Sequence, residues 1–190
     1  MCLSFVALAQ KQTIATDKAT YDGALWTKRL YYLQWIQGTD TYTYFKDGNL
    51  AIFDTKGAQV GAINLQKLSD TYKIEGFPNI TYIDSNQVVV ETSDHFYIYD
   101  YLIERPIFSI TIPEKAENRV YNHQQKAVAY TMDNNLFLAT ESDPRFPIAV
   151  SKDENIISGQ FIHRNEFGIK EGIFWSPKGN YIAFYVKDVS

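Results

Sequence analysis

The chain has 190 residues, of which 45% are hydrophobic and 21% are charged, and this balance excludes an intrinsically disordered protein. The net charge of -4 comes without any basic patch, which argues against nucleic acid as a partner. Cys2 is the single cysteine, so neither a disulfide framework nor a cysteine-based metal site can be built.

The first residues have the composition of the end of a secretory signal. A short apolar stretch leads into Ala7-Leu-Ala9, the pattern of small residues at a signal cleavage site. We interpret residues 1–9 as the remnant of a signal peptide that starts upstream; the alternative is an apolar N-terminus without a targeting role. Residues 10–30 carry little pattern and are assigned as a lead-in.

Beyond residue 30 the sequence predicts one short strand after another, each rich in aromatic and β-branched residues and bounded by turn signals such as Lys46-Asp-Gly-Asn. The predicted strands are Tyr31–Ile36, Thr41–Phe45, Leu50–Asp54, Gln59–Leu65, Ile80–Asp84, Val88–Thr92, Phe96–Tyr101, Ile107–Ile112, Ala127–Met132, Leu136–Ala139, Phe146–Val150 and Tyr181–Val186. Strands and helices do not alternate, so an all-β fold is expected and a parallel α/β sheet is not.

A repeat runs through these strands. Three similar hexads, Asn49-Leu-Ala-Ile-Phe-Asp, His95-Phe-Tyr-Ile-Tyr-Asp and Asn135-Leu-Phe-Leu-Ala-Thr, begin at positions 49, 95 and 135, so their spacings are 46 and 40 residues. A four-stranded propeller blade takes about 40–50 residues. We therefore predict a partial β-propeller over residues 31–190, of about three to four blades and cut before the ring closes, with each hexad as a third strand. A β-sandwich with similar strand spacing is the alternative.

The segment from Gly159 to Tyr185 carries a resemblance. It contains His163-Arg-Asn-Glu-Phe-Gly168 and then the turn Trp175-Ser-Pro-Lys-Gly179 before an apolar strand. This combination resembles the N-terminal β-propeller of dipeptidyl peptidase IV, of the prolyl oligopeptidase family of serine peptidases, in its Bacteroidetes-type members. The similarity is strong from 153 to 188 and diffuse over the residues from 40 onward.

The resemblance implies a substrate-binding role for Glu166. In the family, acidic side chains on this insertion bind the free α-ammonium group of a peptide, and a carboxylate accepts charge-assisted hydrogen bonds from an ammonium. Many family members have two adjacent glutamates here, whereas this chain has Asn165-Glu166, with Arg164 before them as a further candidate. The alternative is that Glu166 is a solvated loop residue.

A second departure concerns the arginine with which the family holds a substrate carbonyl. Arg105 and Arg164 do not match its position, so that anchor stays unassigned.

The catalytic elements of the family are not found in this sequence. None of its ten serines has glycine on both sides, so the Gly-x-Ser-x-Gly elbow is missing. His95, Asp94 and His123 lack a metal-ligand spacing and are interpreted as polar residues at blade edges. No metal or cofactor is implied.

We therefore expect the propeller segment of a secreted or periplasmic serine dipeptidyl peptidase, which removes X-Pro or X-Ala dipeptides from free peptide N-termini. The Ser-Asp-His triad would come from a C-terminal α/β-hydrolase domain downstream, and the 190 residues alone are expected to be inactive. Family members are often dimers, so a homodimer is a further implication. The alternative function is a non-catalytic β-propeller module of the cell envelope that binds proteins or glycans.

Overall fold

The computed structural model describes Thr16, residues 29–162 and residues 168–190. The chain divides into two compact units, Met1–Tyr31 and Tyr32–Ser190. The architecture below is that of the second unit.

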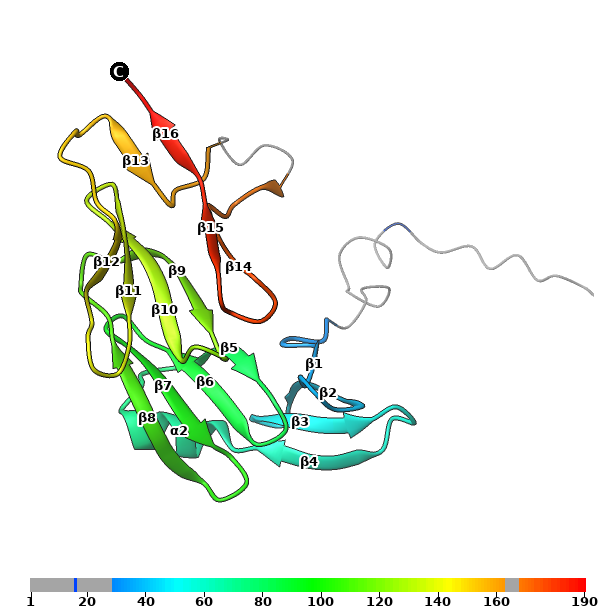
Figure 1. Ribbon diagram of the computed structural model, residues 1–190. Helices are drawn as coiled ribbons and strands as arrows, with labels where there is room; N and C mark the ends of the chain where they lie inside the picture. The colour runs from blue at the N-terminus through cyan, green and yellow to red at the C-terminus, as the bar shows by residue number, and fades with distance from the viewer. Residues whose placement is uncertain (1–15, 17–28, 163–167) are drawn as a thin grey trace, which may run out of the picture. The chain divides into compact units, whose positions relative to one another are not determined.

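Three antiparallel four-stranded sheets follow one another along the chain, and in each the strands pair in sequence order (Figure 1). The first sheet contains β1 (Gln34–Trp35), β2 (Thr41–Lys46), β3 (Asn49–Asp54) and β4 (Gln59–Ile63). The second contains β5 (Asn79–Ile83), β6 (Gln87–Glu91), β7 (His95–Asp100) and β8 (Arg105–Thr111). The third contains β9 (Glu117–Asn122), β10 (Ala127–Met132), β11 (Asn135–Ala139) and β12 (Phe146–Ala149).

Four shorter strands complete the described chain. They are β13 (Ile156–Ser158), β14 (Ile173–Trp175), β15 (Ile182–Phe184) and β16 (Val186–Asp188). β14 pairs with β15, and β13 pairs with β16. The Pro177-Lys-Gly179 turn joins β14 to β15, where Gly179 has a φ of 72° and donates its N–H to the carbonyl of Ser176 at 2.8 Å.

This arrangement is a partial β-propeller, as the repeat predicted. Each hexad forms the third strand of its sheet, β3, β7 and β11, and the fourth strand follows it. Hydrophobic cores lie between successive sheets, because the central strands of the second and third sheets (β6, β7, β10 and β11) are apolar on both of their faces.

The hexads decide which side chain enters which core. Their second and fourth positions face the sheet that follows: Leu50 and Ile52 pack with the second sheet, Phe96 and Ile98 pack with the third, and Leu136 and Leu138 pack with β14 and β15. Their third and fifth positions face the sheet that precedes: Tyr97 and Tyr99 pack with the first sheet, and Phe137 and Ala139 pack with the second. The alternation follows from the two-residue period of a strand.

The structure differs from the sequence prediction after Ile63. The predicted strand Gln59–Leu65 ends there, and helix α2 (Leu65–Tyr72) follows. The side chain of Asn64 caps the helix by accepting the N–H of Lys67 at 2.9 Å, and Lys73 ends it in the left-handed conformation. Leu65 and Leu68 are buried in the core between the first two sheets, so the helix contributes apolar side chains to that core.

β9 and β13 were not predicted, and the predicted strand Tyr181–Val186 is divided between β15 and β16. β9 is mostly polar and shows no clean alternation of apolar and polar side chains, and β13 has only three residues. The N-terminal end of the first predicted strand is also shorter, since only Gln34 and Trp35 pair with β2.

Among the described residues, none of the helices has the length and apolar character needed to cross a membrane.

Candidate functional site

The three residues that the resemblance selected, Arg164, Asn165 and Glu166, lie outside the described residues, as does His163. The structure describes both ends of the loop that carries them, up to Ile162 and again from Gly168. The geometry of those ends shows how the loop leaves the fold.

The two ends of the loop meet at a narrow neck beside Tyr185. The N–H of Gly159 donates to the carbonyl of Tyr185 at 2.8 Å, and the N–H of Tyr185 donates to the carbonyl of Gly172 at 3.0 Å. A Cβ atom on Gly172 would lie 2.3 Å from the carbonyl carbon of Gln160, so no larger residue fits without a backbone shift. Gly159 has a φ of 78°, which favours glycine. The neck therefore fixes where residues 160–171 begin and end.

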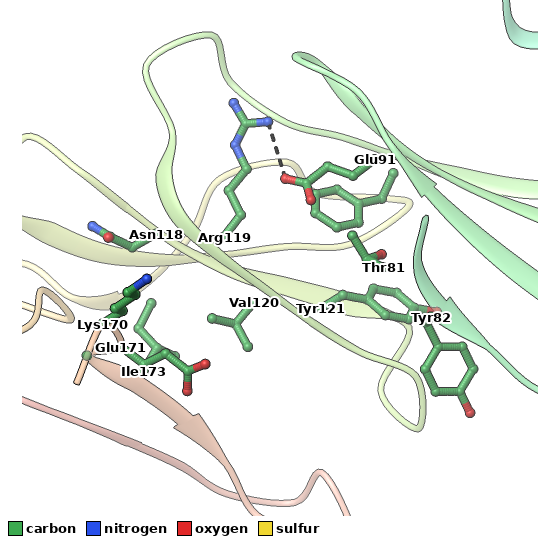
Figure 2. A pocket seen from close by; sticks show the side chains of 12 residues that line it. Thr81, Tyr82, Glu91, Asn118, Arg119, Val120, Tyr121, Lys170, Glu171 and Ile173 are labelled. Atoms are coloured by element: carbon green, nitrogen blue, oxygen red, sulfur yellow. Dashed lines mark ion pairs between the residues drawn. The ribbon is translucent and has the colours of Figure 1, made fainter. Parts of the chain in front are cut away.

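A cavity of about 330 Å³ lies next to this neck, between the second and third sheets and the segment that leads into β14 (Figure 2). Its lining comes from four places in the sequence: Thr81 and Tyr82 on β5, Glu91 and Phe96 around the β6–β7 turn, residues 118–121 on β9, and residues 170–173. Residues 170–173, which follow Glu166 in the sequence, thus form one wall of the cavity.

Glu91 and Arg119 form an ion pair at the wall of this cavity, with Arg119 Nη1 3.8 Å from Glu91 Oε1. Figure 2 shows the guanidinium turned toward the Glu91 carboxylate. Only 22% of the Glu91 side chain and 17% of the Arg119 side chain are exposed. Burial raises the pKa of Glu91, because desolvation disfavours the carboxylate, and the charge of Arg119 partly opposes that shift.

Further hydrogen bonds hold the pair in place. Arg119 donates from Nε to the carbonyl of Ala116 at 3.0 Å and from Nη1 to the carbonyl of Thr92 at 2.9 Å. Asn79 Nδ2 donates to Glu91 Oε2 at 3.2 Å. Arg119, on the first strand of the third sheet, therefore connects that sheet to the β6–β7 turn of the second sheet. Its guanidinium also lies beside the Glu91 carboxylate.

The remaining walls are aromatic and polar. Phe96 stacks on Tyr121, with ring centroids 6.0 Å apart. The Tyr121 hydroxyl is buried without a hydrogen-bond partner among the described residues, and burial raises the pKa of Tyr121 strongly. Lys170 and Glu171 line the opposite wall and are exposed. Carboxylates, cations and aromatic surface at one cavity are suited to a ligand with both an ammonium and a carbonyl group.

The two described histidines, His95 and His123, make local contacts at sheet ends. His123 Nε2 lies 3.3 Å from Asp84 Oδ2 and its ring stacks on Tyr82, with centroids 4.5 Å apart. His95 Nδ1 lies 3.1 Å from Asp94 Oδ2, and this neighbour lowers the pKa of Asp94. Within the described parts of the chain, no three His, Cys, Asp or Glu side chains come close enough to hold a metal ion.

Arg119 is the residue that the sequence reasoning missed. Only Arg105 and Arg164 were considered there as anchors for a carbonyl, and Arg105 lies on β8, the last strand of the second sheet. The overlooked signal was the segment Glu117-Asn-Arg-Val-Tyr-Asn122. It is separated from the strand Ala127–Met132 by a single tight turn, as expected for the preceding strand of a hairpin.

Comparison with protein families gives one match over most of the chain. The family described as "Dipeptidyl peptidase IV (DPP IV) N-terminal region" matches residues 78–190, which include the second and third sheets and the loop neck. The match therefore contains every residue that lines the cavity.

Two solved structures and one curated protein are similar. A crystal structure of a putative dipeptidyl aminopeptidase IV from Bacteroides ovatus matches with a TM-score of 0.66 and 28% identity, over 85% of this chain and 23% of that one. Porphyromonas gingivalis dipeptidyl peptidase 4 matches in fold, with a TM-score of 0.52 and 15% identity over 95% of this chain and 28% of that one. Prolyl endopeptidase FAP from Homo sapiens is 23% identical over 172 residues, which are 82% of this chain and 22% of that protein. The chain thus spans about a quarter of the length of these relatives.

Proposed function

This chain belongs to the dipeptidyl peptidase IV N-terminal region family, and on that premise we propose that it is the substrate-binding propeller segment of a serine dipeptidyl peptidase. The intact enzyme would remove X-Pro or X-Ala dipeptides from peptides with a free N-terminus. The propeller would gate access to the active site and bind the α-amine of the substrate.

The observation that carries the proposal is the position of the Glu166 loop inside the matched region. The loop leaves the fold at the neck of Gly159 and Gly172 and re-enters at the wall of the cavity that holds Glu91 and Arg119. A peptide N-terminus in that cavity would meet the carboxylates of Glu91 and Glu171, which line it. The Bacteroides ovatus structure, whose name gives it the same class of activity, supports the same assignment.

In this mechanism Glu166 accepts hydrogen bonds from the substrate ammonium. A charged hydrogen bond of this kind contributes about 1.5–3 kcal/mol. Asn165, which stands where many family members have a second glutamate, accepts with its amide oxygen and adds no charge. Arg164 would contact the substrate from the same loop. Holding the ammonium at a fixed distance from the scissile bond limits the enzyme to peptides cut near their N-terminus.

We assign the unfilled role of carbonyl anchor to Arg119. Its guanidinium lies at the cavity wall, and of its N–H groups the structure engages those on Nε and Nη1 with the carbonyls of Ala116 and Thr92. Nη2 makes no hydrogen bond within the described residues, so its two donors can serve a peptide carbonyl. Glu91 keeps the side chain oriented.

The chemical step would come from a separate domain. Acyl transfer needs a serine nucleophile activated by a histidine, and an aspartate to orient that histidine. A C-terminal α/β-hydrolase domain would supply all three, so the 190 residues by themselves should bind peptides without cutting them. The apolar residues 1–9 fit export of the enzyme to the periplasm or the medium, which fractionation of the producing cells would test.

The test is Glu166→Gln in the full-length protein, assayed on a Gly-Pro reporter with a free amino group. Losing the charged hydrogen bond should lower kcat/KM by a factor of about 10 to 150, since it contributes about 1.5–3 kcal/mol. Glu154→Gln, an exposed glutamate that does not line the cavity, is the matched control and should change kcat/KM less than threefold. An N-acetylated reporter should be a poor substrate for every variant.

A Glu166→Gln variant within twofold of the unmodified enzyme would exclude the ammonium role. If the full-length protein also failed to cleave any reporter, the non-catalytic binding module would become the better account.

A further inference from the structure

Asn118 has a backbone conformation that is unusual for its place in the fold. It lies inside strand β9, and its φ of 48° is in the left-handed region. Among the described residues, every other non-glycine residue with a positive φ lies in a turn. Side chains other than glycine are strained in this conformation, although asparagine tolerates it better than most. Strain of this kind is concentrated at functional sites, so its position next to the cavity is informative.

The conformation of Asn118 belongs to a β-bulge. On β9 the paired positions advance by three residues, from Glu117 to Val120. On the partner strand β10 they advance by only two, from Thr131 to Ala129. β9 therefore contains one extra residue at this point, and its strand bends there. Bulges are common next to active sites, where they redirect a side chain.

The side chain that follows the bulge is that of Arg119. Its Nε donates to the carbonyl of Ala116 at 3.0 Å, and its Nη1 donates to the carbonyl of Thr92 in the second sheet at 2.9 Å. Three residues of a straight strand span about 10 Å, so the contact with Ala116 requires the chain to turn back. The bend at Asn118 provides this turn, and the guanidinium is thereby held at the cavity wall (Figure 2).

A buried threonine holds the bulge in place. Asn118 Nδ2 donates to Thr131 Oγ1 at 2.7 Å, and Thr131 is only 1% exposed. The methyl group of the same threonine faces the loop neck, since a Cβ atom on Gly159 would lie 2.9 Å from Thr131 Cγ2. The bulge therefore has a fixed position relative to the neck at which residues 160–171 begin and end.

We propose that Asn118 is a positioning residue for substrate binding, because its left-handed conformation directs the Arg119 guanidinium toward the cavity. The inference rests on the proposed role of Arg119 as the anchor of a substrate carbonyl. Asn118 also lines the cavity, but its effect on the substrate passes through Arg119. Without the bend, Arg119 loses its contact with Ala116 and the guanidinium is no longer held where a peptide carbonyl would meet it.

The experiment is a double-mutant cycle in the full-length protein, assayed on a Gly-Pro reporter with a free amino group. Asn118→Ala should lower kcat/KM by roughly tenfold to a hundredfold, because alanine disfavours the left-handed conformation and a displacement of about 1 Å at a binding group has effects of this size. Arg119→Met should itself lower kcat/KM. In the Arg119→Met background, Asn118→Ala should have an effect of less than about twofold, since the group that it positions is gone.

Two further variants separate positioning from loss of folding. Asn118→Gly should return kcat/KM to within about threefold of the parent value, because glycine adopts the left-handed conformation without a steric penalty. Asp47→Ala is the control for backbone strain, since Asp47 has a φ of 50° at the exposed β2–β3 turn and does not line the cavity. It should lower the melting temperature by about a few degrees and leave kcat/KM within about twofold.

The contrary outcomes are distinct. Equal losses from Asn118→Ala in the parent and in the Arg119→Met background would overturn the inference, because Asn118 would then act independently of Arg119. A glycine variant as impaired as the alanine variant would overturn it too, since the backbone conformation would not be what matters. If Arg119→Met left kcat/KM unchanged, Asn118 would have no anchor to position. Glu166→Gln reports separately on the α-amine, so the proposed function is tested apart from each of these results.

Discussion

Arg119 and Glu91 lie 28 positions apart in the sequence, yet their charged groups approach to 3.8 Å across the boundary between the second and third sheets. The same guanidinium donates to the carbonyl of Thr92 in the second sheet and to that of Ala116 in the connection between the two sheets. One side chain therefore joins two blades and also forms part of the wall of the cavity proposed to receive the substrate.

Replacing Arg119 by methionine should destabilise the fold. It removes two hydrogen bonds and leaves the half-buried Glu91 without its counter-charge, so we expect the free energy of unfolding to fall by about 2 kcal/mol. Urea unfolding would measure this, with Arg105→Met as the control at an exposed position on β8. In a double-mutant cycle with Glu91→Gln, the two changes should be non-additive by about 1 kcal/mol; additive effects would show that the ion pair does not couple the sheets.

Glu91 should make stability depend on pH. Its pKa is raised by burial, so the folded state binds the proton more tightly than the unfolded state does. The free energy of unfolding should therefore decrease as pH rises from the ordinary glutamate pKa through the raised folded value. Thermal melts at pH 5 and pH 7 should show this decrease in the parent protein, and Glu91→Gln should reduce it. Glu141→Gln, at an exposed turn, should leave the pH dependence unchanged; equal pH dependence in all three proteins would contradict the assignment.

The loop neck predicts a strong effect at Gly172. Alanine there would bring Cβ within 2.5 Å of three backbone atoms of Gly159 and Gln160, so the fold should lose about 3 kcal/mol or the loop should shift. Gly61→Ala is the matched control, because its Cβ would make an ordinary contact of 3.6 Å with Ile52. Chemical denaturation of both variants tests the idea, and similar losses at the two positions would show that the neck tolerates a side chain.

Trp175 provides a test of how β14 joins the third sheet. Its Nε1 donates to the carbonyl of Val120 at 3.1 Å, and its ring packs in the core next to Ala129 and Leu136. Trp175→Phe should keep most of the packing and lose the hydrogen bond, which lowers the free energy of unfolding by about 1 kcal/mol. Phe174→Leu, on the exposed side of the same strand, should cost less than 0.5 kcal/mol. Equal costs would mean that the indole hydrogen bond contributes nothing.

Much of the fold could be predicted from the sequence, because side chains alternate with a two-residue period along each strand and the hexads repeat. Leu50, Phe96 and Leu136 share one position in that repeat, and all three are buried toward the following sheet. Helix α2 was missed because Ile63-Asn-Leu65 continues the apolar–polar alternation of the preceding strand, and the capping role of Asn64 depends on its backbone conformation. β9 was missed because Asn118, Arg119 and Asn122 make it polar, and their partners come from other strands and from turns.

The sequence by itself determined the all-β class, the order of strands, the hexad repeat and the family resemblance, because each of these depends on residues that are neighbours along the chain. Only the tertiary structure decided that Arg119 meets Glu91 and that Gly159 and Gly172 form a neck. These facts depend on contacts between segments far apart in sequence, whose spacing is set by how successive sheets pack and not by any local pattern.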